Sequence, residues 1–121
     1  MKKDPKCITI LIDFLGRKGD DYHLNEAENL YNKYIGTNIH LYYKFKVNAL
    51  SSLLSSCYIH NDMIRGQRIF NKIDMILNDV DCNDNNIKAP IYITLSNLYG
   101  QNDKFDKVNE IREILTQQKI K

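Results

Sequence analysis

The chain aligns with itself when it is shifted by 42 residues, and this internal repetition limits its possible folds more than any other feature. Two columns of the alignment hold mostly apolar residues: Leu11, Leu53 and Leu95, and Leu15, Cys57 and Tyr99. A third column holds residues that suit a helix C-terminus or a turn: Gly19, Asn61 and Asp103. Because similar apolar spacing recurs on both sides of this turn column, the sequence predicts three copies of one structural unit.

Each copy has the pattern of two helices joined by a short turn. In the first copy, apolar residues follow the i, i+3, i+4, i+7 spacing of an amphipathic helix: Ile8, Leu11, Ile12 and Leu15. A second apolar stripe follows the turn at residues 16–21: Leu24, Ala27, Leu30, Tyr31 and Tyr34. We expect the remaining polar positions of this second helix to face water: Asn25, Glu26, Glu28, Asn29 and Lys33.

The later copies predict helices at about residues 47–59, 63–77, 90–100 and 104–118. The fifth helix is expected to begin near Pro90, because proline suits the first helical turn. Two polar joints separate the copies, at residues 36–46 and 79–88, and the composition of the second predicts a solvated loop.

These patterns predict an all-α fold, an α-solenoid of three antiparallel helical hairpins in which no hairpin can bury its apolar stripe alone. The expected repeat-like units span approximately residues 6–35, 47–78 and 89–118 of a single helical-repeat domain, residues 1–121. The low content of chain breakers, 5 Gly and 2 Pro, argues against an all-β protein with many tight turns.

The composition excludes several classes of protein. Hydrophobic residues make up 43% and charged residues 26%, as in a globular chain, and the net charge of +2 permits a polyanionic partner without indicating one. The three cysteines form no Cys-x-x-Cys pair, which predicts reduced thiols, with no disulfide scaffold and no zinc site made by this chain alone. The known phosphate-loop, nucleophile-elbow and His-Glu-x-x-His motifs are missing, so we expect no catalytic residues, no metal and no cofactor. Without an apolar run of about 20 residues, no membrane partner is expected.

Several segments look like parts of pentatricopeptide repeat proteins. Residues 8–19 (ITILIDFLGRKG) and 24–33 (LNEAENLYNK) resemble the two helices of one repeat. Residues 49–62 (ALSSLLSSCYIHND) and 89–115 (APIYITLSNLYGQNDKFDKVNEIREIL) resemble the C-terminal E region of the plant-type PLS subfamily. The resemblance covers nearly the whole chain, in the family's order. The chain departs from the family pattern at Phe105, at Lys107, at Asn61 and in an insertion at residues 20–23.

The resemblance implies a right-handed superhelix fragment, similar in build to tetratricopeptide repeats. It implies a module that binds single-stranded organellar RNA or positions an RNA-editing or processing machinery, with a deaminase or editing factor as a possible protein partner. The deaminase signature, His-x-Glu followed by Pro-Cys-x-x-Cys, has no counterpart here, so the chain is expected to be non-catalytic by itself. The implied location is a mitochondrion or plastid, although no targeting peptide is recognised in the chain. The alternative is a helical-repeat module for protein–protein interaction that does not bind RNA.

The resemblance also indicates which residues would contact RNA. Thr9, Ser51 and Ile93 match the base-reading position of the family, and Ile93 has no hydrogen-bonding group. Lys6 and Asn48 match the positions that flank a base. The predicted RNA-binding residues are therefore Thr9, Ser51, Lys6 and Asn48. The alternative is that Thr9 and Ser51 are ordinary polar residues of a helix surface.

Overall fold

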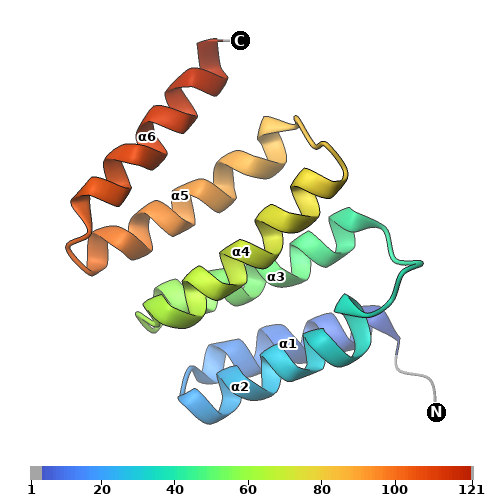
Figure 1. Ribbon diagram of the computed structural model, residues 1–121. Coiled ribbons are helices and arrows are strands. Elements are labelled where there is room, and N and C mark those ends of the chain that lie inside the picture. Colours follow the sequence, from blue (N-terminus) through green and yellow to red (C-terminus); the bar gives the residue numbers. More distant parts are fainter. Residues whose placement is uncertain (1–3, 121) are drawn as a thin grey trace.

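The computed structural model describes residues 4–120, and the side chains of residues 4–117. It contains six α-helices: α1 (Pro5–Lys18), α2 (Asp21–Leu30), α3 (Tyr43–Ile59), α4 (Met63–Asp79), α5 (Asn85–Gln101) and α6 (Phe105–Ile120). Helix α2 continues into a short π-helix, η1 (Tyr31–Gly36). Figure 1 shows three helical hairpins stacked in a row, with α1–α2 at one end and α5–α6 at the other. The all-α solenoid of three antiparallel hairpins is therefore confirmed.

The turn column has the same backbone geometry in all three hairpins. Gly19, Asn61 and Asp103 adopt positive φ angles of 74°, 56° and 60°. A residue in this left-handed conformation ends an α-helix, because the following N–H groups then turn back to the last free carbonyls. The amide of Asp62 donates to the Cys57 carbonyl at 2.8 Å, and the amide of Lys104 donates to the Tyr99 carbonyl at 3.0 Å. The 42-residue period of the sequence thus recurs in the backbone, as a positive φ angle at the turn of each hairpin.

Helix α5 begins five residues before Pro90, so the expectation that residues 79–88 form a loop is wrong for its second half. Asp84 is the reason, because its carboxylate accepts a hydrogen bond from the amide of Asn86 at 2.9 Å and caps the helix. Pro90 lies inside the helix, where its missing N–H removes only one backbone hydrogen bond. The additional turn brings Asn86 onto a helix beside α3.

The first helices of the hairpins form one layer, in which α3 packs between α1 and α5. Helix α3 consequently supplies several fully buried side chains of the core: Leu50, Leu53, Leu54 and Cys57. Close approach of α1 and α3 depends on Gly16, since a Cβ atom there would overlap the Ser56 side chain. No helix within residues 4–120 has the length and apolar character needed to cross a bilayer.

The expectation that Glu28 faces water is also wrong. Its side chain is only 9% exposed and lies between α2 and α4. It accepts hydrogen bonds from the Arg68 guanidinium at 2.8 and 2.9 Å and from Arg65 Nε at 3.4 Å, and Lys72 Nζ lies 3.4 Å away. Helices α2 and α4 do not touch through their backbones, so these side chains bridge the space between them.

The arrangement of the three cysteines gives a prediction about thiol reactivity. Cys57 and Cys82 are buried and Cys7 is exposed, and burial raises the pKa of the Cys57 thiol to about 12. Since only the thiolate reacts, we expect a thiol reagent to modify one cysteine rapidly in the native protein and all three after unfolding. The rapid phase should disappear in Cys7→Ser. Rapid modification of native Cys57 would contradict the buried position of this side chain.

Candidate functional site

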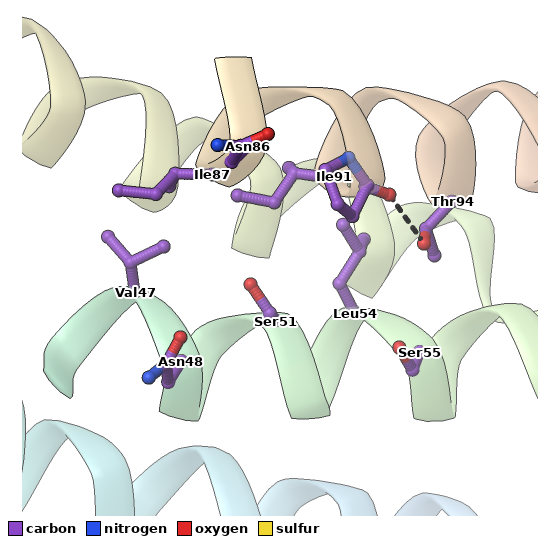
Figure 2. Close-up of a pocket in the computed structure, with 10 residues that line it drawn as sticks. Val47, Asn48, Ser51, Leu54, Ser55, Asn86, Ile87, Ile91 and Thr94 are labelled. Atoms are coloured by element: carbon purple, nitrogen blue, oxygen red, sulfur yellow. Dashed lines mark hydrogen bonds between the residues drawn. The ribbon is translucent and has the colours of Figure 1, made fainter. Parts of the chain in front are cut away.

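A cleft of about 260 Å³ lies between the first halves of α3 and α5. Figure 2 shows its lining, which comes from these two helices: Val47, Asn48, Ser51, Leu54, Ser55, Asn86, Ile87, Pro90, Ile91 and Thr94. The floor is apolar and the edges carry hydroxyl and carboxamide groups. None of the lining side chains is charged, so the cleft suits a neutral group with an apolar face and a hydrogen-bonding edge.

Two of the four predicted RNA-binding residues, Asn48 and Ser51, line this cleft. They lie three residues apart on α3, which places them on neighbouring positions of one helix face. Figure 2 shows the Ser51 hydroxyl directed toward α5. Within residues 4–120 neither side chain has a hydrogen-bond partner, so both keep their donors and acceptors for a ligand.

The other two predicted residues, Lys6 and Thr9, lie one hairpin away on α1 and outside this cleft. The Thr9 hydroxyl donates to the Pro5 carbonyl at 2.9 Å, which leaves its oxygen lone pairs to accept a hydrogen bond. Lys6 is exposed in the first turn of α1, where its backbone amide donates to Asp4 at 2.9 Å. The structure therefore brings Asn48 and Ser51 together and leaves Lys6 and Thr9 as a separate pair.

A second hollow of about 410 Å³ lies between α1 and α3, on the other side of α3 from the cleft. Its polar side comes from Asp13, which pairs with Arg17 at 2.9 Å and accepts a hydrogen bond from the Ser52 hydroxyl at 3.1 Å. Ser55 lines both hollows and is the ridge between them. Hollows with polar groups at their edges thus lie on both sides of α3 in the layer of first helices.

Asn86, Thr94 and Ser55 also line the cleft and were not predicted from the sequence. Asn86 lies in a segment whose composition predicts a loop, so the sequence does not indicate its position on α5. Thr94 carries a signal that could have found it, because the 42-residue shift pairs it with Ser52, which lines the preceding hollow. The Thr94 hydroxyl donates to the Pro90 carbonyl at 2.9 Å, as Thr9 does to Pro5.

A row of helical hairpins with hollows between its first helices defines a helical-repeat scaffold. The chain is distantly related, over nearly its whole length, to pentatricopeptide repeat-containing proteins. Two from Arabidopsis thaliana, both named as mitochondrial, are 29% identical over 119 residues and 27% identical over 121 residues. The matches cover 94% and 99% of this chain but only 9% and 20% of the relatives. No family model and no solved structure matches the chain.

Proposed function

We propose that this chain is a non-catalytic module of a single-stranded RNA-binding protein, and that the cleft between α3 and α5 receives one base. The observation that carries the proposal is the position of Asn48 and Ser51, which face an uncharged cleft with free hydrogen-bonding groups. In helical-repeat RNA readers, two or three side chains of a repeat contact the edge of one base. A carboxamide and a hydroxyl can both donate and accept, as such an edge requires.

The proposal also covers the domain organisation of the chain and its location in the cell. We propose one helical-repeat domain with units at residues 6–35, 47–78 and 89–118. The names of the relatives favour a mitochondrial location, with a plastid as the alternative. A more specific role is to position an editing or processing factor, such as a deaminase, on the bound transcript. Support for this role comes from the likeness of residues 89–115 to the E region.

A second candidate function is protein–protein interaction without RNA binding. One observation favours it: Ile93, at the position matching Thr9 and Ser51, is half exposed and apolar. An apolar side chain at this position suits a protein surface better than the polar edge of a base.

Binding of fluorescent single-stranded RNA pools at two salt concentrations tests the proposal. We expect affinity to fall as salt rises, because contacts to phosphates release counterions. The double substitution Asn48→Ala and Ser51→Ala should weaken binding about tenfold, since each lost hydrogen bond is worth roughly 0.5–1.5 kcal/mol.

A matched control removes two carboxamides from the exposed surface of the second helices, in Asn29→Ala and Asn71→Ala. This double variant should bind RNA as the unchanged chain does. Equal affinities for the two double variants would refute the base-binding cleft, and the absence of salt-sensitive binding would favour the protein-interaction function.

A further inference from the structure

The face of α1 that points away from α3 carries an exposed apolar stripe. It consists of residues spaced as one side of a helix: Cys7, Ile10, Leu11 and Phe14. Ile10 is 70% exposed and Phe14 is 53% exposed. A contiguous stripe of this kind on a soluble protein marks an interaction surface.

The repeat shows what kind of partner fits this stripe. A shift of 42 residues carries it onto Ala49, Ser52, Leu53 and Ser56 of α3. That face of α3 packs against α1, where Ser52 bonds to Asp13 and Ser56 covers Gly16. The exposed stripe of α1 is therefore the same face that joins one hairpin to the preceding one.

The complementary face is exposed at the opposite end of the row. On α3, the side toward α5 includes Val47, Ser51 and Leu54. The 42-residue shift carries these positions and Tyr58 onto four residues of α5: Ala89, Ile93, Ser96 and Gly100. All four are at least partly exposed, and apart from Ile93 they are small. Large side chains on α1 thus have a face of mostly small residues as their counterpart on α5.

We propose that the α1 stripe of one chain docks on the α5 face of a second copy of the same chain, head to tail, in the arrangement that joins neighbouring hairpins. In this arrangement Phe14 takes the place of Ser56 and Gly100 takes the place of Gly16. The larger side chain then has room, because a Cβ atom on Gly100 meets nothing closer than Val108 Cγ2 at 4.0 Å.

Charge at the turns supports a second copy as the partner. Within the chain, the His60 ring covers Gly19, and the Asn102 amide donates to Asn61 Oδ1 at 2.8 Å. Both contacts join equivalent positions of successive hairpins. Across two copies the same positions are Lys18 and Asp103, which carry opposite charges. Lys18 already extends over the Phe14 ring, with its Nζ 5.1 Å from the ring centroid.

Two blocking variants of the full chain test the proposal by sedimentation velocity. Phe14→Asp places a charge in the α1 stripe, and Gly100→Leu fills the face on α5. Because a head-to-tail interface uses two different surfaces, each variant alone should remain a single chain. An equimolar mixture should form dimers, since each variant keeps the surface that the other lacks. The unchanged chain should show a mass that rises with concentration.

Lys18→Glu tests whether Lys18 of one copy lies beside Asp103 of the other. We expect the substitution to weaken self-association about two- to fivefold, as for the loss of an exposed ion pair. A single-chain mass for the unchanged protein at every concentration would overturn the proposal. So would association of Gly100→Leu alone, because it would indicate a symmetric α1–α1 contact. The outcome does not depend on RNA binding, which is measured separately.

Discussion

Replacing Glu28 with alanine is expected to lower the free energy of unfolding by about 2–4 kcal/mol. Three cations of α4 share the Glu28 carboxylate as an acceptor, and its loss leaves Arg65 without its buried partner. Arg65 has a side chain only 6% exposed, and an uncompensated buried charge is costly. The expected loss of stability is smaller than the largest losses seen when a buried ion pair is broken, because Arg65 also pairs with Asp21 and Asp62.

Urea unfolding followed by circular dichroism measures the change, with Glu26→Ala as the matched control. Glu26 is exposed on the same helix, so its replacement should change the free energy of unfolding by no more than about 0.5 kcal/mol. A similar decrease in the free energy of unfolding in both variants would show that the ion pairs of Glu28 do not stabilise the fold. Replacing Glu28 and Arg65 together with apolar residues should cost less than Glu28→Ala, because the buried charge of Arg65 is then removed as well, while Arg68 and Lys72 are exposed enough to be solvated.

The pH dependence of stability gives the same interaction a second signature. Hydrogen bonds from Arg68 lower the pKa of Glu28 from 4.5 to about 2, the charges of Lys72 and Arg68 adding to the effect. A carboxyl whose pKa is depressed in the folded state contributes stability above its unfolded pKa. That contribution is lost as pH falls from about 4.5 through about 2. The stability difference between the unchanged chain and Glu28→Gln should therefore shrink over this window, and a constant difference would contradict the depressed pKa.

The fold could be predicted from the sequence because its information is local and repeated. The apolar spacing gives the helices, and the turn column fixes where Gly19, Asn61 and Asp103 must bend the chain. The start of α5 could not be predicted, because residues 85–88 are mostly polar and have loop composition, and the Asp84 cap overrides this composition. Glu28 was missed because its partners are on another hairpin: periodicity within α2 carries no information about Arg65 and Arg68.

Of the two walls of the candidate cleft, only the polar residues of the α3 wall could be predicted from the sequence. Asn48 and Ser51 lie on one helix, so their shared face follows from their spacing. The residues of the opposite wall, on α5, could not be predicted from the spacing. The spacing shows neither which helices become neighbours nor that Asn86 lies in a helix. Even so, once α3 is known to lie between α1 and α5, the 42-residue shift relates the contacts on its two sides.

Gly16 and Gly100 occupy the same position in the first and third hairpins, since they are 84 residues, or two periods, apart. Their surroundings differ because a neighbouring hairpin covers only the first. Gly16 is buried against α3, where a Cβ atom would overlap both the Ser56 hydroxyl and its Cβ atom. Gly100 is partly exposed, and a Cβ atom there would make only an ordinary contact with Val108 Cγ2, at 4.0 Å.

The same substitution at the two glycines should therefore have very different consequences for stability. Gly16→Leu is expected to lower the free energy of unfolding by about 3 kcal/mol, because the added side chain separates α1 from α3 and outweighs the gain in helix propensity. Gly100→Leu should change it by no more than about 1 kcal/mol, with propensity favouring leucine. Urea unfolding at low protein concentration, where chains do not associate, measures both. Equal losses at the two positions would mean that helix propensity or the local turn, rather than the contact between hairpins, decides which residue each position tolerates.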